Sequence, residues 1–311
     1  MYLSCLFLSL LALQADRPGR PHVVFVTGDC EYRSEITMPL IAQLLEKRHG
    51  MKCTVCYAVE EKTGAISPKN LKNIKGLEAL QSADLVVFYL RYRQLPDEQL
   101  RHVIDYLDRY RPGRPIVGLR TSTHAFRYPP GPNDKWNDSF GRDVFGQKWI
   151  SHHGHDSSTR VFVAVKDHPI TRGLAAEFWC RSWLYHVTPL HGDCTPLLLG
   201  QALKEPKADE TIQKGIAKKQ SFGTPHPVAW TKTYNGARVF FTTLGHPLDF
   251  EDDNMRKLLL NGIFWALGKE KDIPPQGCNP DLVHSYKAPP TTMPLPDPLE
   301  KQLPERGIAH K

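Results

Sequence analysis

A chain of 311 residues, with 41% hydrophobic and 23% charged residues, has the composition of an ordinary globular protein. The formal net charge is +7, but Lys and Arg are mixed with Asp and Glu along the chain, and no basic run is interleaved with aromatic residues. This pattern argues against nucleic-acid binding. After the first fifteen residues, no stretch is apolar enough to span a membrane.

The first fifteen residues differ from the rest of the chain. Residues 3–13 are almost wholly apolar, and Gln14 and Ala15 separate them from the charged pair Asp16 and Arg17. The run has the length of a signal-peptide core and is too short to span a bilayer. We therefore expect residues 1–15 to be a signal peptide and the protein to be exported, to a periplasmic or extracellular location. No Lys or Arg precedes the run, so a buried first segment or a start further upstream is the alternative.

Residues 21–125 alternate between short β-rich runs and helical periodicity. We expect strands over 22–27, 52–59, 83–89 and 115–119, and helices over 37–49, 71–80 and 96–111. Alternation of this kind predicts an α/β fold with a parallel sheet and helices on both faces. Ligands of such sheets bind at the carboxyl ends of the strands, so the loops that follow the first, third and fourth strands are the first places to search.

The second half of the chain lacks this regular alternation of strand and helix patterns. Residues 126–154 are rich in Gly, Pro, Asn, Asp and Trp and predict a long structured excursion, and 204–222 predict an exposed one. Further strands are expected over 161–165, 195–199, 227–233 and 237–243, the last two as a hairpin that turns at Asn235 and Gly236. Asp252 and Asp253 would cap a final helix that ends at Gly268. The Pro-rich residues 271–311 are expected to form an extended strap that passes into disorder.

Seven cysteines form no tight framework. Cys53 and Cys56 lie three apart in an expected strand, so their side chains would point to opposite faces and could not easily share a metal or a disulfide. Cys180 and Cys194 are able to pair in an oxidising compartment, with buried free thiols as the alternative.

The first of four polar clusters follows the first strand. It contains two carboxylates, a phenol and a guanidinium, on Asp29, Glu31, Tyr32 and Arg33. These groups are suited to binding hydroxyls or to acting as an acid and a base. The alternative is a helix-leading loop whose charges are solvated or paired.

The second cluster follows the fourth strand and contains Arg120, Thr121, Ser122, Thr123 and His124. A tight turn from strand to helix exposes a side chain at its apex, and hydroxyl and imidazole groups there suit acyl transfer. Bulky Arg120 and Thr121 replace the small residues that such a turn normally has. The polar wall of a binding site is therefore the favoured interpretation.

The third cluster, residues 151–160, is the densest group of histidines in the chain. In an extended segment His153 and His155 share a face and could reach one metal ion, for which zinc is the natural candidate. No established zinc spacing supports this, and imidazoles that bind a polyol or steady the loop are the competing interpretations. Ser158 and Arg160, in the same segment, are candidate binding residues.

The fourth cluster, residues 242–250, lies between a strand and the final helix. His246 with Asp249 three residues later has the pattern of a base and its orienting acid. The alternative is that His246 merely caps the strand end. All four clusters fall at the same predicted edge of the sheet, which favours a single site.

Several segments together resemble the ThuA-like family, named for trehalose utilisation. They are Val-Gly-Leu-Arg-Thr-Ser-Thr-His-Ala-Phe (117–126), His-Pro-Ile-Thr-Arg-Gly-Leu (168–174), Pro-Val-Ala-Trp (227–230) and Arg-Val-Phe-Phe-Thr-Thr-Leu-Gly-His (238–246). The segments 28–35 and 152–160 resemble a secreted branch found in sugar-degrading bacteria such as planctomycetes. The resemblance covers residues 21–270. It implies a flavodoxin-like, class I glutamine amidotransferase-like sheet and a role with trehalose or related, including oxidised, sugars.

The sequence departs from these relatives in two places. Amidotransferases have a cysteine at the turn after the central strand, whereas residues 118–124 contain none, so glutaminase activity is not expected. His246 falls where their C-terminal histidine would lie. The segment 179–185 keeps Tyr185 but lacks the acidic pair that often precedes it, which puts in doubt any role of those carboxylates, including part of a metal site.

These observations predict a carbohydrate-processing hydrolase or isomerase, with a non-catalytic carbohydrate-binding or complex-forming module as the alternative. The partner is a small carbohydrate, and a homo-oligomer is compatible with the sequence. The expected acid–base residues are Glu31, His124, His155 and His246. The expected substrate-binding residues are Asp29, Tyr32, Arg33, Arg120, Thr121, Thr123, His153, Ser158, Arg160, Tyr185 and Asp249.

Overall fold

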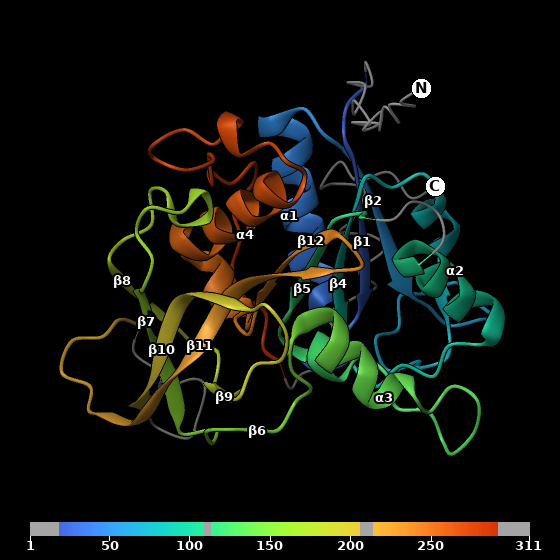
Figure 1. The fold of residues 1–311 in the computed structure, drawn as a ribbon, viewed down its shortest axis with the longest axis horizontal. Helices are drawn as coiled ribbons and strands as arrows, with labels where there is room; N and C mark the ends of the chain where they lie inside the picture. The colour runs from blue at the N-terminus through green and yellow to red at the C-terminus, as the bar shows by residue number, and fades with distance from the viewer. Residues whose placement is uncertain (1–18, 109–112, 206–213, 292–311) are drawn as a thin grey trace, which may run out of the picture.

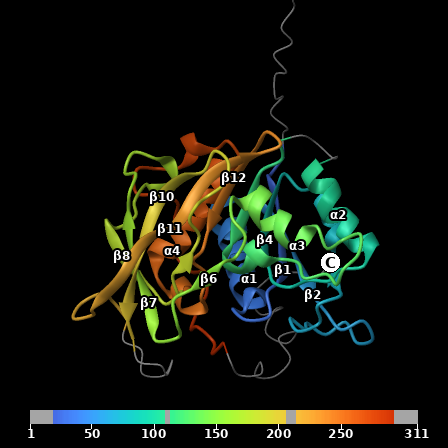
Figure 2. The same cartoon turned by 60° about the horizontal axis from the view of Figure 1, so that its bottom comes forward.

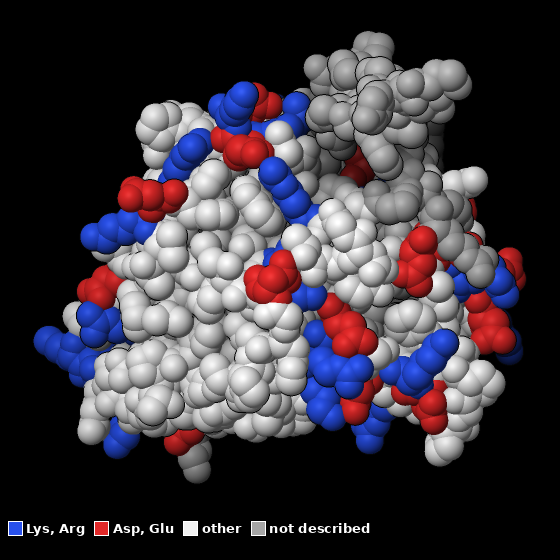
Figure 3. All heavy atoms as spheres, in the orientation of Figure 1, with Lys and Arg blue, Asp and Glu red and all other residues white. Residues whose placement is uncertain are grey.

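The computed structural model of the chain describes residues 19–108, 113–205 and 214–291. The expected signal peptide and the last twenty residues of the C-terminal extension lie outside the described residues. In the part that is described, no helix is both long and apolar enough to cross a membrane. On the face shown in Figure 3, basic and acidic side chains are interspersed.

One ten-stranded sheet organises the molecule (Figures 1 and 2). In spatial order its strands are β3 (Ile74–Lys75), β2 (Lys52–Ala58), β1 (His22–Gly28), β4 (Leu85–Leu90), β5 (Ile116–Leu119), β12 (Ala237–Thr242), β11 (Ser221–Tyr234), β10 (Thr195–Lys204), β7 (Ser157–Val163) and β8 (Glu177–Cys180). The strands from β2 to β12 run parallel to one another. From β11 to β8 the sheet continues with antiparallel pairs. The predicted parallel sheet is confirmed, and the antiparallel strands extend it.

Helices cover both faces of the parallel half, as predicted. The structure has α1 (Ser34–His49), α2 (Asp97–Asp108), α3 (Trp136–Ser139) and α4 (Asp253–Ala266). Successive residues of β1 alternate between two cores: Val23 and Phe25 pack with α1 and α4, whereas Val24 and Val26 pack with α2. A strand buried on both faces needs this continuous apolar run, which explains why 22–27 shows no polar alternation.

The cysteines of β2 are likewise divided between the two faces of the sheet. Cys53 packs against the core that contains α1 and α4, and Cys56 is buried in the opposite core, so the predicted division between two faces is confirmed. Cys180 and Cys194 are free thiols rather than a disulfide pair. Cys180 is buried, as the free-thiol alternative supposed.

Two predicted helices differ from the structure. The helix expected from residue 37 begins at Ser34, because Asp29 accepts hydrogen bonds from the backbone N–H groups of Tyr32 and Ser34 and fixes the helix start. The helix expected over 71–80 is wrong over its first half. There the short strand β3 pairs with β2, and Gly76, at φ 91°, turns the chain into a single 3₁₀ turn at Leu77–Gln81.

The residues after α4 form the expected strap as far as residue 291. Ile273 and Cys278 are buried, and Arg48 of α1 donates hydrogen bonds to the carbonyls of Asp281 and Leu282. The strap therefore holds the C-terminal end of α1 against the segment that follows α4.

Candidate functional site

The turn after β5 is occupied by Arg120, whose backbone has a φ of 41°. Its side chain is fully buried and points inward, where Nη1 donates to the carbonyls of Thr243 (2.9 Å) and Trp183 (3.3 Å), and Nη2 donates to the hydroxyl of Tyr32 (3.0 Å). The guanidinium also lies over the rings of Tyr32 (4.2 Å) and Tyr185 (4.7 Å). The strained apex position therefore holds a buried cation, stabilised by neutral acceptors and aromatic faces.

Two buried histidines flank this cation. Burial, followed by the charges of Arg91 and Arg120, lowers the pKa of His124 to about 3. Burial also lowers the pKa of His246 well below its ordinary value. His246 Nδ1 accepts a hydrogen bond from the backbone N–H of Leu248 (3.1 Å), so its proton is on Nε2. Both side chains are neutral at pH 7.

A rim of polar and aromatic groups lies above the buried side chains. Glu31 pairs with Arg91, with 3.0 Å between Oε2 and Nε. The ring of His152 stacks on Trp183 (5.2 Å between centres), and the ring of His155 lies 4.0 Å from the same indole. The rim side chains that are at least partly exposed are Glu31, Arg91, Trp149, His152 and His155.

His152 has a defined tautomer. Burial lowers its pKa, so the neutral form predominates at pH 7. Its Nδ1 lies 2.5 Å from the carbonyl oxygen of His153 and must donate to it, which leaves the lone pair on Nε2. His152 is therefore the rim histidine that is set up to accept a proton.

Two predicted site carboxylates have their oxygens occupied by nearby hydrogen-bond donors. Asp29 accepts from the N–H groups of Glu31 (3.0 Å) and Tyr32 (2.6 Å), and burial raises its pKa to about 6. Asp249 accepts from the hydroxyl of Ser182 (2.5 Å) and from the N–H groups of Ser182 and His246. Both carboxylates hold site loops in place.

The remaining predicted residues are distributed around the site. Thr123 donates its hydroxyl to the Arg120 carbonyl, and Thr121 is buried with no hydrogen bond to its hydroxyl from the described residues. Arg33 turns away to the carbonyl of Pro290 in the strap. Ser158 and Arg160 lie on β7, where their partners are Glu205 and Glu177, respectively.

His153 and His155 do not meet around a common point. His153 contacts His186 (4.6 Å between ring centres) and Phe222 (5.1 Å), whereas His155 contacts Trp183 with its ring tilted, on the side of the rim. No group of three or more His, Cys, Asp or Glu side chains within the described ranges stands ready to hold a metal ion.

Sequence reasoning missed Arg91 and His152. Arg91 directly follows β4, a loop that the strand pattern had singled out, and His152 belongs to the histidine-rich segment. Their positions next to strand ends were the available signal. What the sequence lacked was the distant partner, Glu31 for Arg91 and Trp183 for His152, that brings each side chain to the rim.

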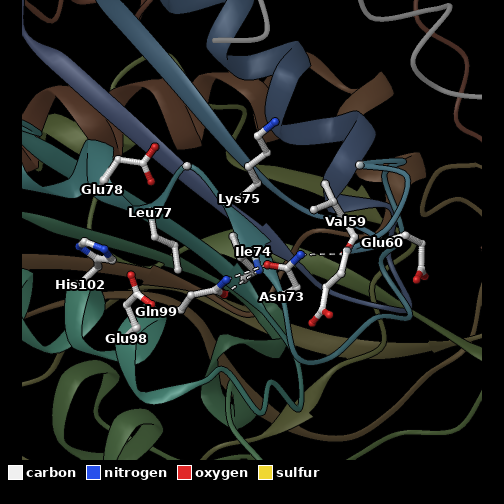
Figure 4. A pocket seen from close by; sticks show the side chains of 13 residues that line it. Val59, Glu60, Asn73, Ile74, Lys75, Leu77, Glu78, Glu98, Gln99 and His102 are labelled. Carbon is white, nitrogen blue, oxygen red and sulfur yellow. Dashed lines mark hydrogen bonds between the residues drawn. The ribbon is translucent and has the colours of Figure 1, made fainter.

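A separate cavity of about 410 Å³ lies beside β3 and the start of α2 (Figure 4). Its central amides bind one another: Gln99 donates to Asn73 (2.7 Å) and accepts from the backbone N–H of Ile74 (2.8 Å). The carboxylates of Glu60 and Glu98 lie around them (Figure 4). None of the predicted site residues lines this cavity.

The sheet and the cluster at its carboxyl edge define an α/β protein with a flavodoxin-like parallel core. The chain belongs to the ThuA family, whose sequence model, described as "Trehalose utilisation", matches residues 23–266. No curated protein matches the sequence.

Two solved structures are similar to this fold. A ThuA-like protein from Bacteroides uniformis is 18% identical, with a TM-score of 0.51, over 86% of this chain and 99% of that chain. A ThuA-like protein from Parabacteroides merdae is also 18% identical, with a TM-score of 0.50, over 80% of this chain and 90% of that chain. At this identity the likeness establishes the fold.

Proposed function

We propose that the chain binds and converts a carbohydrate at the carboxyl edge of its sheet, as a hydrolase or an isomerase. The observation that carries the proposal is the rim, where the Glu31 carboxylate, the lone pair of His152 and the ring of Trp183 come together beside Arg91. Membership of a family described by trehalose utilisation supports a role with sugars.

The rim has the chemistry that sugar binding needs. The indole of Trp149 and the imidazoles of His152 and His155 are flat surfaces on which the C–H face of a pyranose can lie. Beside them, the Glu31–Arg91 ion pair presents carboxylate acceptors and guanidinium donors, which suit neighbouring hydroxyl groups. Aromatic faces next to a few placed polar groups are typical of small-molecule sites.

The same rim supplies proton transfer. Both hydrolysis and isomerisation of a sugar require one group that takes a proton and one that gives it. Glu31 and the Nε2 atom of His152 are the exposed groups suited to these roles. Arg120, enclosed below the aromatic rings, acts as a positioning residue whose charge favours negative charge developing at the rim.

The burial of the deeper groups favours a second candidate, the non-catalytic sugar-binding module. Arg120 is fully enclosed and His246 is only 4% exposed, so neither can touch a ligand in this conformation. A module of this kind would use the rim for binding alone.

Glu31→Gln and His152→Gln are expected to lower turnover by about 100-fold or more, because each removes a proton-transfer group while keeping its size. The measurement is time-resolved NMR of the protein with trehalose, other disaccharides and their keto derivatives. Glu61→Gln and His102→Gln, which change the same residue types at the separate cavity, are the matched controls.

The controls should convert the sugar at the wild-type rate. Line broadening without any product would support the binding module instead. Turnover at the wild-type rate in both rim variants would contradict the assignment of Glu31 and His152.

A further inference from the structure

Among the residues that the structure describes, Arg127 is an arginine beside the rim that has no acidic partner. Its side chain is exposed, and its guanidinium carbon lies 5.1 Å from the centre of the Tyr92 ring. We propose that Arg127 binds a carboxylate on the carbohydrate, so that the substrate is a sugar acid such as a uronic acid. The inference rests on the proposed function, because it names the class of sugar that the same rim receives.

The ring of Tyr92 connects Arg127 to the rim. The guanidinium carbon of Arg91 lies 4.3 Å from the centre of that ring, and Nε of Arg91 lies 3.0 Å from Oε2 of Glu31. The centre of the Tyr92 ring is also 5.1 Å from that of His124. Both guanidinium groups therefore adjoin one aromatic ring, and a single sugar residue is large enough to touch both.

The backbone around Tyr92 fixes this arrangement. The N–H group of Tyr92 donates to the carbonyl of His124 (3.0 Å), that of Arg93 to Ala125 (2.6 Å), and that of Arg127 to Arg93 (3.0 Å). Tyr92 has a φ of 53°, a left-handed conformation that is unfavourable for a residue other than glycine and persists where the surrounding contacts impose it. The Tyr92 ring and the Arg127 side chain thus start from a well-determined backbone.

The charges near the rim favour an anion next to Arg127. The Glu31 carboxylate is paired with Arg91, which reduces its repulsion of an incoming anion. Arg120, buried below, donates to carbonyl and hydroxyl groups and has no salt bridge within the described part of the chain. Arg127 and Arg120 therefore both contribute positive charge that no paired carboxylate cancels.

The chemistry of the guanidinium favours a carboxylate. Its planar fork can donate two parallel hydrogen bonds to the two oxygens of one carboxylate. Because Arg127 lies over the face of Tyr92, the N–H edge of its fork is left for a ligand. One unpaired cation also balances the single charge of a carboxylate better than the double charge of a phosphate.

The test compares methyl glucuronide with methyl glucoside, which differ only in the carboxylate that replaces the C6 hydroxymethyl group. Binding to the full chain is measured near pH 7 by isothermal titration calorimetry. The glucuronide should bind about 10-fold or more tightly, as charge-assisted hydrogen bonds predict. Arg127→Gln should abolish this preference, and Arg127→Lys should keep part of it. Arg101→Gln, which changes an exposed arginine of α2, is the matched control and should keep the full preference.

Salt gives a second readout. Raising the ionic strength should weaken glucuronide binding to the wild type and leave glucoside binding unchanged. Far-UV circular dichroism checks that the variants are folded. An unchanged preference in Arg127→Gln would overturn the carboxylate subsite, as would tighter binding of the corresponding 6-phosphate.

The outcomes also separate this inference from the proposed function. Equal binding of the acid and the neutral sugar by the wild type, with loss of both in Trp149→Ala, would overturn the carboxylate subsite and support the rim as a sugar site. Absence of binding to every probe would overturn the subsite as well. The turnover of neutral disaccharides then decides the proposed function separately.

Discussion

At the scale of single residues, Arg120 and Glu35 are ionisable side chains that the fold encloses in different ways. Both Nη atoms of Arg120 donate to carbonyl or hydroxyl groups and its guanidinium lies over aromatic rings, although its buried Nε has no hydrogen-bond partner among the described residues. Glu35, in the first turn of α1, is 2% exposed and has a 3.6 Å ion pair with Arg33. Burial, followed by the charge of Asp29, raises the pKa of Glu35 to about 7. The partners of Arg120 offset its burial better than Arg33 offsets that of Glu35.

Glu35 should therefore weaken the fold as the pH rises. Its pKa is raised in the folded state, so its stabilising contribution is complete below the unfolded value and is lost as the pH passes through about 7. We expect the wild-type free energy of unfolding to fall by about 2 kcal/mol from this residue between about pH 5 and pH 8. Glu35→Gln should remove that part of the fall in urea unfolding measured across the range.

Glu61→Gln, an exposed glutamate, serves as the control and should keep the wild-type dependence. Equal pH dependence in Glu35→Gln and wild type would show that Glu35 is ionised without cost in the folded protein.

At the scale of elements, one amide joins α4 to two other segments of the chain. Asn261, fully buried in α4, donates from Nδ2 to the carbonyls of Ile170 and Arg172 (3.0 Å each) and accepts through Oδ1 from the N–H of Cys278 (2.9 Å). It thereby fixes the strap to the helix and to the loop before β8.

Asn261→Ala is expected to lower the free energy of unfolding by about 2–4 kcal/mol, because it leaves three buried backbone groups unpaired. Limited proteolysis should then cut the strap earlier than in the wild type. Lys257→Ala, on the same helix with an exposed hydrogen bond to Gly173, should lose less than about 1 kcal/mol. Comparable losses in the two variants would show that Asn261 does not hold these segments together.

The elements also show where sequence patterns suffice. The buried runs of β1, β4 and β5 and the apolar stripe of α4 are local signals, so these elements were predicted well. The segment 71–76 was not, because its conformation depends on a contact with Gln99, 25 residues away. Likewise the four polar clusters placed most of the site at one edge of the sheet, but the inward turn of Arg120 follows from distant carbonyl groups.

At the scale of the whole molecule, the parallel and antiparallel halves are one sheet. β12 is parallel to β5 on one side and antiparallel to β11 on the other, and Trp230 of β11 donates to the carbonyl of Phe145 across this junction (2.7 Å). The sequence predicted strands in both halves, although not β8, but could not join the halves, because strand partners far apart in the chain leave no local pattern.

A continuous sheet should unfold as a unit. We expect a single denaturant transition in the full chain, with the same midpoint by far-UV circular dichroism and by tryptophan fluorescence. Two separate transitions, or midpoints that differ between the two signals, would indicate that the halves are independently stable.

The ribbon formed by β6 (Ser151–His152) and β9 (Tyr185–His186) has strands of only two residues each, yet their pleat sorts side chains to opposite faces. His152 and Tyr185 are paired and stack together toward Trp183, whereas His186 lies on the other face beside His153. The ribbon therefore separates the rim from His153, His186 and His226, whose rings contact one another in sequence on its other face. Because the same two short strands carry His152 and Tyr185 on one face and His186 on the other, a shift of the ribbon would displace side chains on both faces together.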